Sequence, residues 1–463
     1  MEVAFLVNAR RETLKPQIAA QLALRGYLVP PAYLTAPLRK TISAPKRFWP
    51  GPTVIDDGLF DDISRIAAHP LVQPQATVAK QLDAVAAHSR TRQQLPKALR
   101  DWVDRCVAQI DTLASHATPF ALADALNLNP SAVVGVERIE AAVWFRVGIE
   151  PPWVTQGYQR LARMNTKIAR QTVASARKKL CAAVEDLPVV CASDYDSAYA
   201  AGRIFAQAGV QAAALPFGAY MADSRSADSY RMAGRKVDLG AHYTLRPIRC
   251  VLVARGFMDG WRSVSAKPPV HIHLLGLGQP LVLALTLLPF RGVKQVTCDA
   301  TSPFKDAADG VIYTEQPVFR KLKAAAVTAH LLGKATGHWD CPCPYCTQAQ
   351  TAQSWATARA LLGRLSPAEQ TRALTMGKDS KLAKPLAYFA QPATAQMAQL
   401  RALHNHWVVI RSIDQLNQVA PSSRALERFV RKSIQSYRTA VGKDSYADAF
   451  VRACDIAVQR ADH

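Results

Sequence analysis

The chain has 463 residues, of which 49% are hydrophobic, so it can bury a large core and is not a wholly disordered protein. Its 57 Lys and Arg residues exceed its 35 Asp and Glu residues and give a net charge of +22, distributed along the chain. A charge of this size predicts a polyanionic partner, most often nucleic acid, with an anionic membrane surface as the second option.

Nine cysteines and the lack of a secretory signal predict a protein of the reducing cytoplasm. Residues 271–290 are the one run with the length of a membrane span, but two histidines, Gln279, Pro280 and Pro289 interrupt it. This run therefore predicts a strand, a turn and a helix, and we expect no membrane partner.

The N-terminal segment predicts one strand, one helix and one loop. Residues 3–7 are an apolar run typical of a buried strand, and residues 14–25 have helical spacing that stops at Gly26. Residues 29–52 are rich in proline and basic side chains and lack a clear period, so we expect an ordered loop there.

Two carboxylates, Asp56 and Asp57, directly follow the apolar run 53–55 and precede Gly58. Carboxylates at the C-terminal end of a strand lie where barrels and open α/β sheets have their reactive groups. An Asp-Gly turn that caps the next helix is the alternative explanation.

The next part of the chain predicts helices and one further strand. Residues 78–115 have the pattern of one or two amphipathic helices, and the strand-like run 120–124 again ends on an aspartate, Asp124. A helix over residues 158–180 would carry basic side chains on one face, with few acids to balance them: Arg160, Arg163, Lys167 and Arg170. This face predicts contacts with phosphates, and a solvated surface is the alternative.

Short apolar runs recur in the second half of the chain, and helix-length segments separate most of them. These runs are residues 187–191, 212–217, 250–254, 271–275 and 293–299, which brings the total to about eight. Repeated strand–helix units of this kind support a parallel α/β barrel. A closed barrel and a doubly wound open sheet both fit the pattern.

Asp299 ends the last of these runs, as Asp56 ends an earlier one. Two carboxylates across a barrel mouth fit a retaining exchange at an anomeric carbon, in which one attacks the sugar and the other shuttles a proton. Gly276 and Gly278 follow the run 271–275 and predict a tight loop that lets a flat ring approach the backbone.

Three cysteines lie within six residues at Cys341, Cys343 and Cys346, and His404 follows downstream. Three thiolates and one imidazole are a typical tetrahedral Zn²⁺ shell, and four protein ligands leave no open position, so this zinc would be structural. His406 and the upstream His338 are rivals of His404 for the fourth position.

The metal motif resembles the zinc subdomain of the tRNA-guanine transglycosylase family, whose cysteines precede a helix with His-Asn, here His404-Asn405. The Leu-Gly-Leu-Gly-Gln-Pro segment, residues 275–280, resembles that family's Met-Gly-Val-Gly-Thr-Pro segment. The Val-Ile-Asp-Asp-Gly-Leu-Phe segment, residues 54–60, resembles its strand followed by Asp-Ser-Gly-Gly-Phe. The long interval between Cys346 and His404 is more similar to the DNA-directed, DpdA-like branch.

The resemblance implies a (β/α)8 TIM barrel over residues 1–335, a zinc-binding subdomain over residues 336–410 and a C-terminal helical segment over residues 411–463. It implies that Asp299 is the nucleophile and that Asp56, with Asp57 as its substitute, is the general acid and base. The residues it implies for base binding are Asp124, Gly218, Gly276 and Gly278.

The activity implied is the exchange of guanine for a 7-deazaguanine base, similar to preQ0, in DNA through a covalent aspartyl–sugar intermediate. The same exchange on tRNA is the first alternative, and a non-catalytic, zinc-containing nucleic-acid-binding protein is the second. An accessory protein that opens duplex DNA is a further candidate partner.

Overall fold

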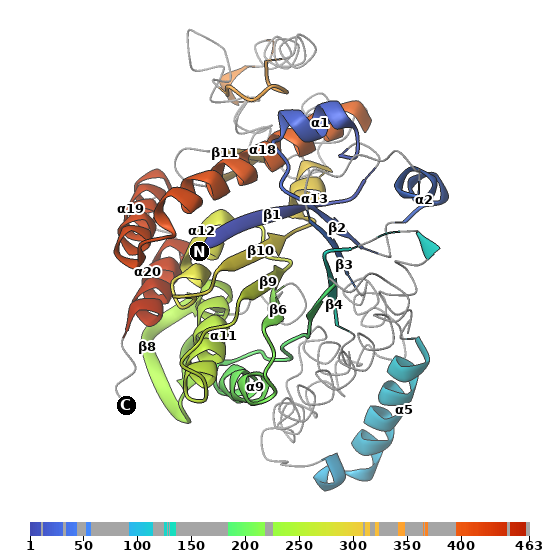
Figure 1. The fold of residues 1–463 in the computed structure, drawn as a ribbon. Helices are drawn as coiled ribbons and strands as arrows, with labels where there is room; N and C mark the ends of the chain where they lie inside the picture. The colour runs from blue at the N-terminus through green and yellow to red at the C-terminus, as the bar shows by residue number, and fades with distance from the viewer. Residues whose placement is uncertain are drawn as a thin grey trace.

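The computed structural model describes residues 1–10, 13–30, 34–43, 52–56, 92–113, 125, 126, 128, 130–135, 184–217, 226–308, 311–314, 320–323, 341–347, 364, 366–368, 395–441 and 445–459. Within these ranges, eight parallel strands form a curved sheet (Figure 1). In sheet order they are β5 (Glu185–Leu187), β4 (Ala132–Val134), β3 (Thr53–Ile55), β2 (Tyr27–Val29), β1 (Glu2–Asn8), β10 (Gln295–Asp299), β9 (His271–Leu275) and β6 (Ala212–Pro216).

The two end strands of this sheet come together and nearly close a barrel. Directly after β5, Val189 bridges in parallel to Ala214 of β6. The Val190 N–H donates to the Ala214 carbonyl at 2.8 Å, and the Ala214 N–H donates to the Pro188 carbonyl at 3.0 Å. The sequence expectation of an α/β fold with a parallel barrel is therefore confirmed at this level.

Alternation along the strands separates the barrel interior from its outer face, because successive side chains of a strand point to opposite sides. The interior holds a small apolar cluster of Leu6, Leu28, Val54, Ala132, Val134, Leu187, Val189, Ala212 and Ala214. Side chains of the other parity, such as Phe5 and Val7 of β1, join the larger core outside the barrel.

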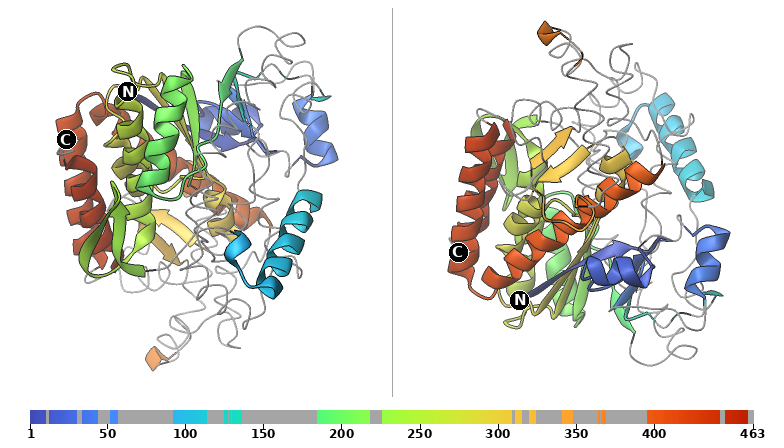
Figure 2. Two further views of the ribbon diagram at one scale, coloured as in Figure 1. Left: turned by 90° about the horizontal axis from the view of Figure 1, so that it is seen from below. Right: turned by 90° about the horizontal axis from the view of Figure 1, so that it is seen from above.

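The helices around the barrel bury this larger core (Figure 2). They are α1 (Pro16–Gln21), α2 (Ala36–Ile42), α5 (Lys97–Leu113), α9 (Tyr195–Gln207), α11 (Leu245–Arg262), α12 (Pro280–Leu287), α13 (Ser302–Ala308), α18 (Ala395–Val419), α19 (Ser423–Val441) and α20 (Ser445–Val458). A 3₁₀ turn, η2 (Arg92–Gln94), precedes α5. Two antiparallel hairpins, β7 (Ser226–Met232) with β8 (Arg235–Thr244) and β11 (Val311–Thr314) with β12 (Arg320–Lys323), complete the described elements.

Helix α18 joins the C-terminal region to the first strand of the barrel. The side-chain amide of Asn417 accepts from the Val3 N–H at 2.7 Å and donates to the Val3 carbonyl at 2.8 Å. Arg25 adds an exposed ion pair to Asp414 at 3.1 Å. These contacts align α18 along β1 (Figure 1), so the helix that carries His404 is fixed to the barrel.

Two sequence expectations about the elements were wrong. Residues 250–254 lie inside α11, which is buried nearly all round, and an apolar run of this length cannot be told from a strand by its period. Residues 29–52 were expected to be a loop, but α2 lies within them and β2 ends at Val29. His404 lies well inside α18, which runs without a break from Ala395 to Val419.

The fourth strand of the barrel was not among the expected strands. The run 120–124 lies outside the described residues, and β4 is formed by the short run Ala132–Val134. Within the described part of the chain, no helix is both long enough and apolar enough to cross a membrane.

Candidate active site and candidate metal centre

Asp299 is the last residue of β10 and lies at the C-terminal mouth of the barrel with only 5% of its surface exposed. Its Oδ1 accepts the Gly276 N–H at 3.0 Å and lies 3.6 Å from Nε2 of His273. Among the described residues no hydrogen bond reaches Oδ2. One carboxylate oxygen is thus held in position, and the other remains available to a ligand.

The glycines after β9 are required by the backbone geometry around Asp299. Gly276 has a φ of +72°, in the left-handed region that side chains disfavour, and this turn aims its N–H at Asp299. A Cβ on Gly278 would lie 2.3 Å from the Cβ of Ala300, so only glycine fits against the residue that follows Asp299. The two glycines therefore shape the mouth, and no ligand contact is needed to explain them.

A row of polar side chains runs along the inside of β9 and β10 toward Asp299. His271 Nδ1 lies 2.5 Å from Oε2 of Glu185, and His271 Nε2 lies 2.7 Å from the Thr297 hydroxyl. The same hydroxyl lies 2.7 Å from Nδ1 of His273. The histidines and the threonine are buried, so the row links the half-exposed Glu185 to the buried Asp299.

Asn8 ends β1, the strand that neighbours β10, and is 1% exposed. Leu6 pairs with Asp299 in the sheet and faces the barrel interior. Asn8, two residues later on the same strand, therefore faces the same side, at the barrel mouth. Both amide atoms of Asn8 are buried without a hydrogen-bond partner among the described residues. Buried polar groups are rarely left unpaired, so this amide is a candidate ligand contact.

Asp56 follows β3 at the same mouth, and its N–H donates to the Val29 carbonyl at 3.2 Å. Strands β1 and β2 lie between it and β10 in the sheet. The other residues expected at the site, Asp57, Asp124 and Gly218, lie outside the described residues. The same holds for the expected nucleic-acid contacts Arg160, Arg163, Lys167 and Arg170.

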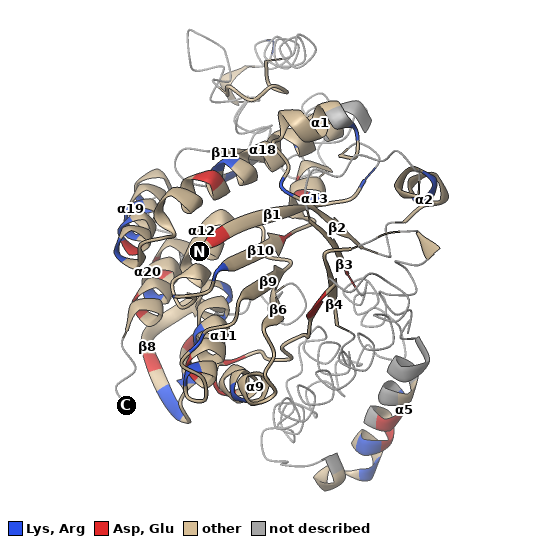
Figure 3. Ribbon diagram, viewed as in Figure 1, with Lys and Arg blue, Asp and Glu red and all other residues tan. Residues whose placement is uncertain are grey.

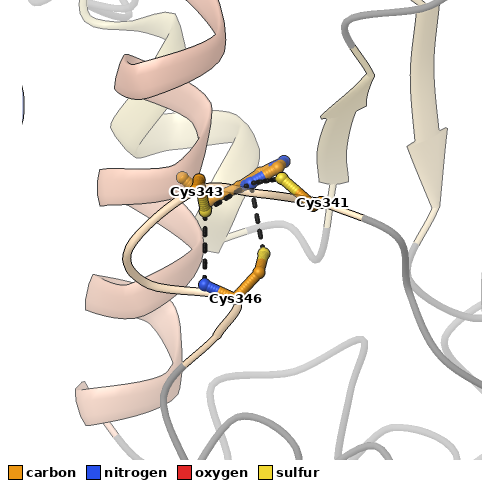
Figure 4. Close-up of side chains that lie close together, drawn as sticks. Cys341, Cys343 and Cys346 are labelled. Carbon is orange, nitrogen blue, oxygen red and sulfur yellow. Dashed lines mark hydrogen bonds between the residues drawn. The ribbon is translucent and has the colours of Figure 1, made fainter.

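The second site is formed by Cys341, Cys343, Cys346 and His404, whose ligand atoms all lie within 4.8 Å of one another. The three sulfurs lie 3.5, 3.3 and 3.3 Å from Nδ1 of His404. Figure 4 shows the three cysteine side chains converging from one short loop. Tetrahedral coordination at ordinary zinc bond lengths sets a sulfur–nitrogen separation of about 3.5 Å, so the donor set and its spacing fit a bound metal.

Neighbouring groups orient these ligands. Nε2 of His404 lies 2.8 Å from the Tyr313 carbonyl, which fixes the hydrogen on Nε2 and leaves Nδ1 as the ligand atom. The Cys346 N–H donates to the Cys343 sulfur at 3.2 Å. Hydrogen bonds from Cys341 and Cys346 lower the pKa of Cys343, and the same contacts raise the pKa of Cys346, so Cys343 is the first thiol of the cluster to ionise to the thiolate that a metal requires.

The rival ligands are not part of this cluster. His406 lies on the same helix but turns its Nδ1 to the Ala402 carbonyl at 2.7 Å, and burial lowers its pKa to about 4. Its ring packs on Phe304 and Phe5. His338 lies outside the described residues. Among the described candidates, His404 is therefore the fourth ligand of the group.

Asn405 couples the metal centre to the segment that follows Asp299. Its amide accepts from the Tyr313 N–H at 2.9 Å and donates to the carbonyls of Pro303 and Val311 at 3.2 and 3.1 Å. Pro303 belongs to α13, which begins directly after the β10 mouth. The His-Asn pair on α18 therefore holds both the metal loop and the start of α13.

Basic residues lie on the outer helices within the described part of the chain (Figure 3). On α19, Arg431 pairs with Glu427 at 3.0 Å and Arg438 with Asp448 at 3.6 Å. Arg424, Arg428 and Lys432 are exposed on the same helix. These cations account for part of the positive charge.

Sequence reasoning missed Asn8 and the interior row. The signal for the row was the alternation of His271 with His273 and of Thr297 with Asp299 in two predicted strands. It becomes interpretable only when the two strands are known to be neighbours. A scan against protein-family models finds no matching family, and a search of curated proteins finds no match.

Proposed function

We propose that this protein is a guanine transglycosylase with a (β/α)8 TIM barrel and a structural Zn²⁺, which replaces guanine in DNA by a 7-deazaguanine base. The observation that carries the proposal is the buried carboxylate of Asp299 at the barrel mouth, with Oδ1 anchored by Gly276 and Oδ2 open to a ligand. The resemblance of the cysteine motif and the Leu-Gly-Leu-Gly segment to tRNA-guanine transglycosylases supports the same reaction.

In the first half of the reaction, Oδ2 of Asp299 forms a bond to C1′ of the target nucleotide. The glycosidic bond to guanine breaks, and the departing base takes its electron pair and a proton from the Asp56 carboxyl group. In the second half, Asp56 takes a proton from the incoming 7-deazaguanine, whose nitrogen bonds to C1′ as the Asp299 ester breaks. The configuration at C1′ is retained because the carbon is inverted twice.

Zn²⁺ would be held by Cys341, Cys343, Cys346 and His404 and would take no part in the reaction. A closed shell of three sulfurs and one nitrogen leaves no position for water or substrate. Its role would be to hold the metal loop on α18, from which Asn405 reaches Pro303 in α13. The nucleotide must leave its stack to reach the mouth, and the basic surface would bind the backbone.

The test is incubation of the pure protein with labelled guanine or 7-deazaguanine and, separately, duplex DNA, single-stranded DNA and bulk tRNA. We expect label in DNA, and label in tRNA alone would assign the exchange to tRNA. Asp299→Asn should give no label. Asp306→Asn is the matched control. It makes the same chemical change on α13, the helix that follows β10, at an aspartate that pairs with Lys321 at 2.5 Å and has no proposed role in the reaction. If the protein binds nucleic acid in a salt-sensitive way but no label enters DNA or tRNA, it is a nucleic-acid-binding protein without this activity, and the proposal is refuted.

A further inference from the structure

The buried row that ends at Asp299 is too ordered to be explained by packing alone. Glu185, His271, Thr297 and His273 come from β5, β9 and β10, and each successive contact is 2.5 to 2.7 Å long. On β6, between Glu185 and His271, the interior positions are occupied by Ala212 and Ala214. These short side chains leave the space through which Glu185 and His271 meet.

If both histidines of the row are neutral, the Glu185 carboxylate at its end determines which ring nitrogens carry hydrogen. The Glu185 carboxylate accepts, so His271 carries its hydrogen on Nδ1 and accepts with Nε2 from the Thr297 hydroxyl. The Thr297 oxygen then accepts from Nδ1 of His273. Nε2 of His273 would be left with a lone pair facing Oδ1 of Asp299 at 3.6 Å, inside a site where Nε2 has no other partner. Two facing lone pairs in a buried site repel.

One proton added to a histidine of the row removes this conflict in either of two arrangements. If it resides on His273, both ring nitrogens of His273 carry hydrogen. If it resides on His271, the Thr297 hydroxyl turns to donate to His273, whose hydrogen moves to Nε2. Both arrangements direct an N–H at Asp299, and the single positive charge lies between the two carboxylates of Glu185 and Asp299.

We propose that His273 is a positioning residue, which directs a hydrogen on Nε2 at Oδ1 of Asp299, and that Thr297, His271 and Glu185 maintain this hydrogen. The inference rests on the proposed role of Asp299 as the nucleophile. The Gly276 N–H then holds Oδ1 by a hydrogen bond, the Nε2–H of His273 faces the same oxygen across 3.6 Å, and Oδ2 is left to attack C1′. The same donors stabilise the carboxylate charge that returns when the ester bond breaks.

The first test is the hydrogen placement itself, measured by nitrogen-15 NMR of histidine-labelled protein with His273→Gln for assignment. We expect Nε2 of His273 to carry hydrogen in the wild-type protein. Asp299→Ala removes the carboxylate that stabilises the added proton, so Nε2 should lose its hydrogen in that variant. A bare Nε2 in the wild-type protein, or one unchanged by Asp299→Ala, overturns the proposal.

The second test is the rate of covalent adduct formation with an oligonucleotide substrate. His273→Leu removes the donor and should slow the rate about 10- to 100-fold, the worth of a hydrogen bond to a charged group. His273→Gln keeps an N–H and should recover most of the rate. Thr297→Val breaks the row and should slow adduct formation, whereas Thr286→Val removes a buried hydroxyl that bonds only to the Val282 carbonyl in α12 and should not.

The two tests separate this inference from the proposed function. If the wild-type protein forms no adduct but Asp299→Ala still removes the hydrogen from Nε2 of His273, the positioning role of His273 is supported and the transglycosylase proposal fails. If the wild-type protein forms the adduct and His273→Leu forms it equally fast, the function stands and the positioning role is refuted.

Discussion

The metal centre and the barrel interior are both built from clustered polar residues, but the two differ in how the sequence presents them. Three of the four metal ligands lie within six residues of one another, on a loop held by one helix. The interior row takes its members from β5, β9 and β10, separated by long stretches of chain. A local motif reveals its chemistry directly, whereas a cluster made by strand pairing is hidden until the sheet is known.

The two regions also differ in what they are expected to do. The candidate metal centre offers four protein ligands, which would leave a bound metal no open position, and Asn405 ties it to α13, so we expect it to act in stability. The interior row ends on a carboxylate with one oxygen open at the barrel mouth, so we assign it to chemistry. Variants in one region should therefore change stability, and variants in the other should change activity.

The largest effect is expected for Asp299→Asn, which should lower base exchange by at least about 10⁴-fold, the usual loss when a nucleophile is removed. The amide has the same shape as the carboxylate, so the midpoint of thermal unfolding should stay close to that of the wild-type protein. Exchange assays and thermal unfolding on the same preparations measure both quantities. If Asp299→Asn is inactive because it is unfolded, the proposal that this region acts in activity and the metal centre in stability would be contradicted.

Removal of one metal ligand should give the largest effect on stability. Cys343→Ala should release the bound metal and lower the free energy of unfolding by at least about 3 kcal/mol, because metal binding to a structural site is folding free energy. Metal content by mass spectrometry and denaturant unfolding measure the two outcomes. Cys454→Ala is the control, since this buried cysteine of α20 is not part of the metal group. Equal metal content in Cys343→Ala and the control would exclude the site.

Asn8 tests the difference between stability and activity, because it lies at the barrel mouth and its side-chain amide has no hydrogen-bond partner among the described residues. Asn8→Leu removes an unpaired buried amide, so we expect unchanged or slightly raised stability. If the amide binds the substrate, the variant should raise KM about 10-fold, the worth of one hydrogen bond at the upper end of the neutral range. Steady-state kinetics with varied oligonucleotide concentration checks this. A loss of stability without any change in KM would give Asn8 a structural role instead.

Cys250 of α11 lies outside both regions and should have a smaller effect, on the pH dependence of the free energy of unfolding. Burial raises its pKa to about 12 from an ordinary value of 9.0, so above pH 9 the unfolded chain releases a proton that the folded protein retains. The folded state therefore loses stability as pH rises from 9, by about 1.4 kcal/mol per pH unit for this group. Cys250→Ala should show a flatter decline between pH 9 and 10.5 in denaturant unfolding. Identical slopes would contradict this burial effect.

Much of this architecture could be predicted from the sequence, for reasons that differ between elements. Strands β1, β3, β6, β9 and β10 are apolar runs bounded by turn residues, and the metal ligands are fixed by local spacing. Strands β2 and β4 are three residues long, too short to show a period, whereas the equally short β3 was marked by the two carboxylates that follow it. The run 250–254 was mistaken for a strand because α11 is buried on nearly every side.

The candidate nucleophile could be predicted and its surroundings could not. Asp299 was identified because it ends an apolar run, which is a local feature. Its partners Gly276 and His273 come from the neighbouring strand and the loop after it, and Glu185 reaches His271 past the intervening strand β6. These contacts depend on barrel order and register, which no local pattern contains.

The most direct measurement of the central claim is the mass and position of a covalent adduct trapped between the protein and an oligonucleotide. After denaturation and digestion, we predict one added sugar-linked species on the peptide that contains Asp299, absent from Asp299→Asn. An adduct on another residue, or none in the presence of base exchange, would contradict the assignment of Asp299 as the nucleophile.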